Sequence, residues 1–213
     1  MTDDSTATGV LLDLDGTLVD SVFHHVIAWD RALRDAGLQI PLWRIHAGIG
    51  MGSERLVPWL LGQPEADHKP LADAHEDAFL EQAANLRQTP GAADLVEDLR
   101  QRAVPFRVAT SAGGAVSAAL VEALGVGDPG TIGADDVGAP KPAPDLLVAG
   151  CEELGLAPER VTIVGDSPWD AEAAQRIGMR TIAVRCGGFG DDVLRGAGAA
   201  DVVDDPRALI GRL

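Results

Sequence analysis

Beyond about residue 90, segments with helical periodicity alternate with short apolar runs, and this alternation limits the possible folds more than any other feature. Short apolar strands separated by helices are typical of parallel strands joined by right-handed crossovers. An earlier apolar run, residues 10–15, ends in carboxylates before a glycine, as a buried parallel strand does where it meets solvent. We therefore expect an α/β fold built on a doubly wound parallel sheet. The expected helices are 92–102, 114–124, 144–154 and 169–177, and they precede expected strands at 106–110, 131–134, 161–164 and 181–184.

Residues 21–88 have a different sequence pattern, because apolar side chains recur there at helical spacing and no strand pattern is visible. Helices are expected at about 21–36, 53–61 and 69–87. The sequence therefore predicts two domains. Residues 1–20 and 89–213 form the α/β core, and residues 21–88 form an all-helical insertion after the first strand.

The chain is strongly acidic, since 33 acidic side chains against 17 basic ones give a formal net charge of −16. Such a surface repels phosphate groups, so neither nucleic acid nor an anionic membrane is expected as a partner. An anionic substrate would need a metal ion or local positive charge. Two cysteines, Cys151 and Cys186, cannot build a disulfide framework. Because no signal peptide and no membrane-spanning stretch are visible either, we expect a cytoplasmic location.

Polar residues follow each of the first four predicted strands. In an open α/β sheet, ligands bind beyond the carboxyl ends of the strands, so these residues are expected to meet at one edge. The sequence places Asp13 and Asp15 after the first strand, Thr110 and Ser111 after the second, Lys141 after the third, and Asp166 and Ser167 after the fourth, with Asp170 one helical turn later.

The aspartates at this edge indicate a metal site. Alternate residues of a strand point the same way, so Asp13 and Asp15 can lean towards one position. An ordinary strand exit with a turn, or a helix N-cap for Asp166 and Asp170, is the simpler alternative for each taken alone. Clustered carboxylates repel one another unless a cation compensates, and hard oxygen ligands suit Mg²⁺.

Lys141 is one of only two lysines beside 15 arginines, and it stands between two prolines. An ammonium is a compact point charge that can pair with a carboxylate and a phosphoryl oxygen together. A solvated surface charge is the alternative. Thr110 is either the last β-branched residue of a strand or a phosphate ligand, together with the helix N-terminus that follows it.

These motifs resemble the signatures of the haloacid dehalogenase superfamily in its phosphatase form. Residues 13–21 (DLDGTLVDS) are similar to the first signature, Thr110 to the second, residues 141–145 (KPAPD) to the third and residues 165–170 (GDSPWD) to the fourth. The four occur in family order, and the similarity covers residues 9–204. The helical insertion resembles the small cap of the phosphoglycolate phosphatase and β-phosphoglucomutase branch.

The resemblance implies a Mg²⁺-dependent phosphatase that acts on a small phosphorylated metabolite through an aspartyl phosphate. It implies that Asp13 is the nucleophile and that Asp15 is the general acid and base. It also implies a metal site formed by Asp13, Asp15 through its backbone carbonyl, Asp166 and Asp170, and a phosphate site formed by Gly16, Thr110, Ser111 and Lys141. A sugar phosphomutase of the same branch, and a non-catalytic binding module, are the alternatives.

We expect residues of the helical insertion to recognise the substrate. Arg44 and His46 lie in a stretch that resembles the substrate-reading cap loop of many relatives, although Arg44 could equally be solvated. Where similar sequences often carry a second basic residue, this chain has Ala47 and Gly48. We therefore expect a substrate whose second half is neutral or weakly anionic. All five histidines lie in the insertion, and either His24 or His25 could face the site. The sequence does not indicate an oligomeric state.

Overall fold

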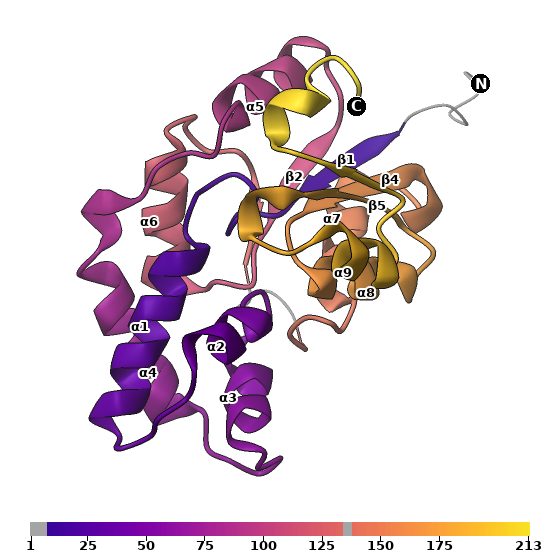
Figure 1. The fold of residues 1–213 in the computed structure, drawn as a ribbon. Helices are drawn as coiled ribbons and strands as arrows, with labels where there is room; N and C mark the ends of the chain where they lie inside the picture. Colours follow the sequence, from indigo (N-terminus) through magenta and orange to yellow (C-terminus); the bar gives the residue numbers. More distant parts are fainter. Residues whose placement is uncertain (1–7, 134–137) are drawn as a thin grey trace.

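A computed structural model describes residues 8–133 and 138–213 of the protein. Six parallel strands form one sheet in the order β3-β2-β1-β4-β5-β6, which confirms the doubly wound α/β fold (Figure 1). Strand β1 lies in the middle, between β2 and β4, at the point where the strand order changes direction. The strands are β1 Gly9–Leu12, β2 Phe106–Ala109, β3 Thr131–Ile132, β4 Val161–Gly165, β5 Arg180–Val184 and β6 Asp201–Val203.

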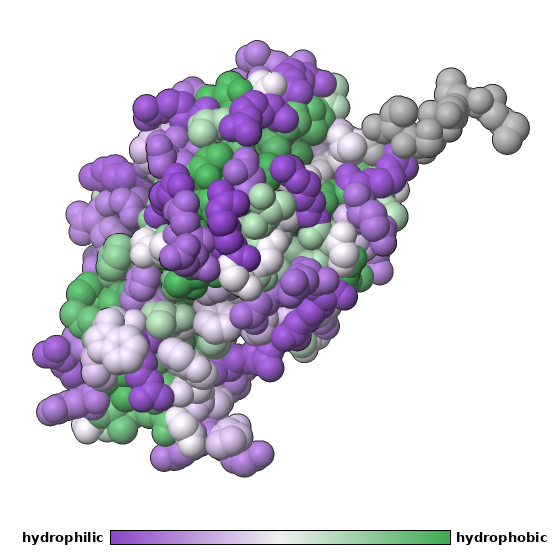
Figure 2. Space-filling view, turned by 45° about the vertical axis from the view of Figure 1, so that its right-hand side comes forward, coloured by the Kyte–Doolittle hydropathy of each residue, from purple (hydrophilic) through white to green (hydrophobic). Residues whose placement is uncertain are grey.

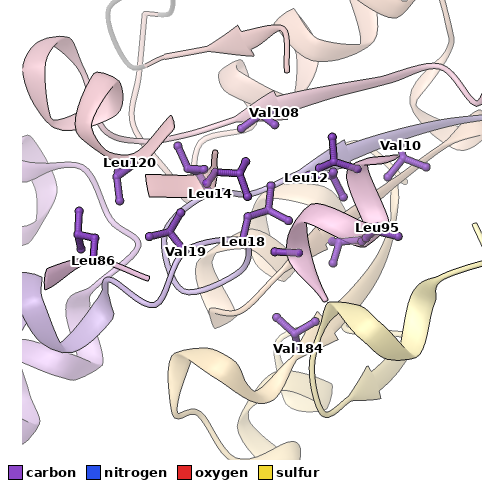
Figure 3. Close-up of a cluster of buried hydrophobic side chains, with 14 of the residues drawn as sticks. Val10, Leu12, Leu14, Leu18, Val19, Leu86, Leu95, Val108, Leu120 and Val184 are labelled. Carbon is purple, nitrogen blue, oxygen red and sulfur yellow. The ribbon is translucent and has the colours of Figure 1, made fainter. Parts of the chain in front are cut away.

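The central strand β1 is buried on both faces because its side chains alternate between two hydrophobic clusters. Val10 and Leu12 point into the larger cluster, and Leu14 continues this row beyond the strand (Figure 3). Leu11 belongs to a second cluster, against Leu147 and Ile163. A strand that is apolar on both faces requires helices above and below the sheet.

The helices provide these two layers. Side chains of α5 and α6 fill the larger cluster, whereas α7 and α8 cover the opposite face. The helices are α1 Val22–Asp35, α2 Leu42–Gly48, α3 Ser53–Leu61, α4 Lys69–Leu80, α5 Ala92–Gln101, α6 Gly114–Leu124, α7 Asp145–Leu154, α8 Pro168–Gln175 and α9 Asp191–Gly196.

Residues 21–88, called the helical segment below, hold α1 to α4 and lie to one side of the sheet (lower left in Figure 1). The segment has its own hydrophobic cluster, built around Trp29, Ile45, Leu56 and other buried side chains. The chain enters and leaves the segment along one paired stretch, since Val19 and Gln88 form an antiparallel bridge.

Several element boundaries differ from the sequence expectation. The first strand ends at Leu12 rather than at residue 15, because the chain turns at Leu14, whose carbonyl accepts from Leu18 N–H. The helix expected at 69–87, which is α4, ends at Leu80, and a 3-10 turn follows. Helix α2 was expected to be a loop, since seven residues are too few to show periodicity. Helix α9 has six residues and strand β6 has three, so both are also too short to show periodicity, and neither was predicted.

The visible surface in Figure 2 is predominantly hydrophilic, with smaller apolar areas between the charged groups. Both cysteines are free thiols. Within the described ranges, no helix combines the length and apolarity that crossing a membrane requires. The first seven residues, considered above for a signal peptide, and residue 134, the end of a predicted strand, lie outside the described residues.

Candidate active site

A cleft of about 300 Å³ lies between the carboxyl edge of the sheet and the helical segment. Four of the residues predicted for the site line it together: Asp13, Asp15, Ser111 and Lys141. The other predicted core residues, Gly16, Thr110, Asp166 and Asp170, are not in its wall and support it from behind, as described below. The structure therefore brings the strand-end residues to one place, as their positions in the sequence indicate.

Three buried carboxylates meet at and behind the core wall of this cleft. Asp13 follows β1, Asp166 follows β4 and Asp170 lies in the first turn of α8, and one oxygen from each lies within 4.8 Å of the others. Burial raises the pKa of Asp13 to about 7, although the nearby Lys141 ammonium opposes this shift. Burial, and then the charges of Asp13 and Asp170, raise the pKa of Asp166 well above its ordinary value. Proximity of like charges therefore makes full ionisation of the cluster unfavourable.

Lys141 supplies a positive charge to this cluster. Its Nζ lies 2.5 Å from Asp13 Oδ1 and 2.7 Å from Asp170 Oδ1, and its side chain is almost fully buried. Burial alone would lower the pKa of Lys141, but the two carboxylates outweigh it and raise that pKa above its ordinary value. Three carboxylates and one ammonium leave an excess of negative charge. The donor set therefore fits a hard divalent cation such as Mg²⁺.

Asp170 is fixed by the start of its own helix. Ser167 is the N-cap of α8. Its backbone N–H donates to Asp170 Oδ2 at 3.1 Å and its Oγ accepts from the Asp170 N–H at 3.4 Å, which forms a capping box, and its hydroxyl lies 2.6 Å from the same Oδ2. The other carboxylate oxygen, Oδ1, is left for Lys141. The N-cap of α8 is therefore Ser167 rather than Asp166 or Asp170, and Asp170 takes part in the cap from position N3.

The loop after β1 approaches Asp166 closely because residue 16 is glycine. Gly16 has φ of +71°, and a Cβ there would lie 2.4 Å from Asp166 Oδ2. The next side chain, Thr17, donates from its hydroxyl to Asp13 Oδ2 or Asp166 Oδ1, each 3.4 Å away. These two residues hold the loop against the carboxylate cluster.

The Asp15 carboxylate is not part of the three-carboxylate cluster and has partners of its own. Its Oδ1 accepts from Ser21 Oγ at 2.7 Å and contacts His25 Nε2 at 2.8 Å, and its Oδ2 accepts from Thr110 Oγ1 at 3.3 Å. Burial alone would raise the pKa of Asp15, but the charge and hydrogen bond of His25 outweigh it and lower this pKa. Asp13 and Asp15 are therefore side by side but differ in ionisation.

A pair of histidines behind Asp15 was not identified from the sequence as a unit. His25 Nδ1 lies 3.0 Å from His75 Nε2, and the two rings stack against Phe79 and Trp29. Burial, helped by the charge of His25, lowers the pKa of His75 well below its ordinary value. Helical periodicity places His25 on the face of α1 that carries Trp29. That periodicity could have indicated that His25 is buried. It could not have indicated the contact with His75, because His75 lies on a different helix, α4.

The turn after β2 forms the other wall of the cleft. Thr110 is fully buried, and its hydroxyl accepts from the backbone N–H of Ala112 at 3.0 Å besides contacting Asp15. Ser111, Ala112 and Gly113 line the cleft just before α6 begins. A helix N-terminus favours an anion, so this wall suits a phosphate group.

Arg44 and His46, expected to read the substrate, are not among the residues that line the cleft. The Arg44 guanidinium lies over the Trp59 ring, 5.6 Å from its centroid, and donates to the Trp59 carbonyl. His46 Nε2 lies 2.8 Å from the Gly187 carbonyl, and its ring stacks between Phe23 and Phe189. The Arg44 side chain therefore connects α2 with α3 through Trp59, and the His46 side chain contacts the core at Gly187.

Comparison with known proteins agrees with this arrangement. The sequence matches the family profile of haloacid dehalogenase-like hydrolases over residues 7–178. A phosphoglycolate phosphatase of Shigella dysenteriae (serotype 1, strain Sd197) is 31% identical over 209 residues, covering 84% of this chain and 81% of the relative. Hexitol phosphatase A of Escherichia coli (strain K12) is 32% identical over 179 residues, covering 83% and 82%. The solved structure of a hydrolase from Pseudomonas syringae matches with a TM-score of 0.92 at 32% identity and 96% coverage of both chains. The chain therefore belongs to the haloacid dehalogenase-like hydrolases.

Proposed function

We propose that the protein is a Mg²⁺-dependent phosphatase that hydrolyses a small phosphorylated metabolite through a phosphoryl group held covalently on Asp13. The observation that carries this proposal is the Asp13 carboxylate itself. It lines the cleft, lies 2.5 Å from the Lys141 ammonium and belongs to the three-carboxylate cluster. The phosphatase names of the relatives support the same reaction class.

In the first step, a carboxylate oxygen of Asp13 attacks phosphorus and the bond from phosphorus to the leaving alcohol breaks. Asp15, which lines the same cleft, gives its proton to the leaving oxygen. In the second step, Asp15 takes a proton from water, whose oxygen attacks phosphorus. Inorganic phosphate leaves, and the Asp13 carboxylate is restored.

The lowered pKa of Asp15 leaves it ionised in the free site. A phosphate dianion next to Asp15 raises that pKa, because like charges disfavour ionisation. Asp15 therefore takes up its proton together with the substrate. Contacts with Ser21, His25 and Thr110 orient the carboxylate for both transfers.

Asp13, Asp166 and Asp170 would hold Mg²⁺, with Asp170 acting either directly or through water. When bound, the ion supplies positive charge to the transferring phosphoryl oxygens. Lys141 and the N–H groups of residues 111–113 bind the remaining phosphoryl oxygens.

We propose further that the helical segment acts as a cap over the leaving group, hinged at residues 17–21 and 89–91. The connection between α2 and α3 already reaches the core, since the Gly50 carbonyl accepts from Ser111 Oγ at 3.4 Å. Gly50 has φ of +98°, and a Cβ there would lie 2.8 Å from Ser167 Oγ. Closure of this kind excludes bulk water from the reaction.

Chelation tests the proposal. Protein treated with EDTA should lose hydrolysis of p-nitrophenyl phosphate, and added Mg²⁺ should restore it. Ca²⁺ should restore it poorly, because Ca²⁺ prefers a larger and looser coordination shell. Full activity after rigorous chelation would contradict the metal assignment, and no activity with any added cation would contradict the phosphatase function.

A further inference from the structure

The wall that the helical segment contributes to the cleft combines apolar and polar side chains. Its apolar side chains are Trp29, Ile49, Met51, Leu56 and Ala72. The polar side chains from the segment in that lining are Ser53, His25, His75 and Glu76, and of these only Glu76 is an acid. A leaving group in the cleft would therefore meet apolar side chains, a hydroxyl, two imidazoles and one carboxylate.

The basic side chains of the helical segment do not reach this wall. Arg31 pairs with Glu81, Arg34 with Asp30 and Lys69 with Asp73. Among the described residues, the only lysine or arginine in the cleft lining is Lys141, which is already shared by two carboxylates. The arginines and the lysine of the segment, all absent from the lining, are Arg31, Arg34, Arg44, Arg55, Arg87 and Lys69.

His25 is also a basic group of this wall and is paired with Asp15, and two further features limit positive charge elsewhere on it. His75 is neutral near pH 7, because burial and the neighbouring His25 lower its pKa well below the ordinary value. The first turn of α3, which borders the cleft at Ser53, carries Glu54 beside its N-terminus. That carboxylate offsets the positive end of the helix dipole.

The small residue at position 48 has a packing reason. Gly48 is buried where α2 contacts α3, and a Cβ there would lie 2.4 Å from Leu56 Cδ1. A long basic side chain at this position would displace Leu56, which is fully buried in the cluster of the helical segment. The packing therefore excludes a basic residue at position 48.

From this geometry we infer that the natural leaving group carries no negative charge and ends in a hydrogen-bond donor, a hydroxyl or an ammonium, that Glu76 accepts. Glu76 is then the residue that determines specificity, and it disfavours a carboxylate such as that of phosphoglycolate. This inference rests on the proposed phosphatase function. In the described structure Glu76 lines the cleft, and the nearby Lys69 pairs with Asp73 instead.

Three two-carbon phosphates of equal length test the inference: phosphoglycolate, hydroxyethyl phosphate and phosphoethanolamine. Their far ends are anionic, neutral and cationic. Each is measured as a substrate with Mg²⁺, and as a competitor of p-nitrophenyl phosphate. For the wild-type protein, phosphoglycolate should have the lowest kcat/KM and the weakest competition, by about tenfold or more, since two like charges a few ångströms apart repel across a partly desolvated cleft.

Charge variants at position 76 sharpen this test. Glu76→Gln should reduce the discrimination against phosphoglycolate about tenfold, and Glu76→Lys should reverse the order of the anionic and cationic compounds. The matched control is Asp77→Asn, which removes one negative charge from the exposed side of the same helix. It should leave the order unchanged, and p-nitrophenyl phosphate turnover should report whether the core remains intact in each variant.

The outcomes separate the two proposals. If p-nitrophenyl phosphate is hydrolysed but phosphoglycolate is the best of the three compounds, the leaving-group inference is wrong and the phosphatase function stands. An unchanged order in Glu76→Lys, with normal p-nitrophenyl phosphate turnover, would also overturn it. If the wild-type protein hydrolyses none of the four phosphates with Mg²⁺, the proposed function fails and the inference fails with it.

Discussion

The two walls of the cleft are built in different ways. The core wall takes its groups from the ends of neighbouring parallel strands, so residues as far apart as Asp13 and Lys141 meet at 2.5 Å. The helical wall takes its groups from α1, α3, α4 and the connection between α2 and α3, and its lining combines apolar and polar side chains. Among the described residues, the cleft lining has its one lysine and two of its three carboxylates at the core wall, whereas the helical wall adds Glu76 and two histidines.

This difference indicates a division of labour between bond breaking and substrate choice. In the proposed mechanism, the core wall holds the groups that every phosphate ester needs, because they would act on the phosphoryl group and the bridging oxygen. Apart from His25, which contacts Asp15, the helical wall would face the leaving group. Substitutions at the core wall should therefore affect all substrates, and substitutions at the helical wall should affect some substrates more than others.

The largest effect is expected for Asp13→Asn. This variant retains the shape of the side chain but removes the nucleophile, so turnover of every phosphate ester should fall on the order of 10⁴-fold or more. Hydrolysis of p-nitrophenyl phosphate and of hydroxyethyl phosphate measures the loss, and circular dichroism verifies the fold. Asp20→Asn is the control, since Asp20 is exposed and lies outside the cleft lining. Substantial turnover by Asp13→Asn would contradict the covalent mechanism.

A smaller loss is expected for His25→Asn, which removes the partner that lowers the pKa of Asp15. With this partner gone, that pKa rises, so the acidic limb of the pH–rate profile should move up by about one unit. Turnover near neutral pH should also fall about tenfold, because the Asp15 carboxylate loses a contact that orients it. His24→Asn is the matched control, because His24 contacts Gln82 instead. An unshifted profile in His25→Asn would show that this histidine does not act through Asp15.

Mg²⁺ affinity should rise by about tenfold from about pH 6 to about pH 8, because Asp13, with its pKa raised to about 7, must lose its proton to bind metal. The sign for stability follows from the same shift. An aspartate with a raised pKa binds more protons in the folded state, so this group destabilises the metal-free protein as pH rises towards 7. The difference in Tm between Mg²⁺ and EDTA samples should therefore grow with pH. A constant difference would contradict this coupling.

The smallest effect is expected for Arg44→Ala. The Arg44 side chain stacks on Trp59 outside the cleft, so its loss should cost about 0.5–1 kcal/mol of stability and leave KM unchanged for hydroxyethyl phosphate. Thermal unfolding and steady-state kinetics measure the two quantities. A KM that rises several-fold would show that Arg44 contacts the substrate, and would contradict its placement outside the cleft.

The core could be predicted from the sequence because its signals are local. A buried parallel strand is a short apolar run, and the group that follows it is delivered to the carboxyl edge of the sheet. Asp13, Asp15, Ser111 and Lys141 were placed in the cleft in this way. Strand lengths were less predictable. Strand β1 ends at Leu12, but its alternation of buried side chains continues as far as Leu14, beyond the end of the strand.

The helical wall could not be predicted because its groups meet only through helix packing. His25 and His75 are 50 residues apart, and nothing in the spacing of either helix indicates that their rings touch. Arg44 was expected to contact the substrate because its stretch resembles the cap loop of many relatives, but in α2 it contacts Trp59. A seven-residue helix is too short for periodicity to show which face is buried.

The most direct test of the account is to find the phosphoryl group on the protein. In Asp15→Asn protein, p-nitrophenyl phosphate should still phosphorylate Asp13, since its leaving group needs little protonation, while hydrolysis of the aspartyl phosphate should be slow. Acid quenching during turnover, digestion and mass spectrometry should then find one added phosphoryl group on the peptide that contains Asp13. A phosphoryl group on any other residue, or none while p-nitrophenol is released, would contradict the account.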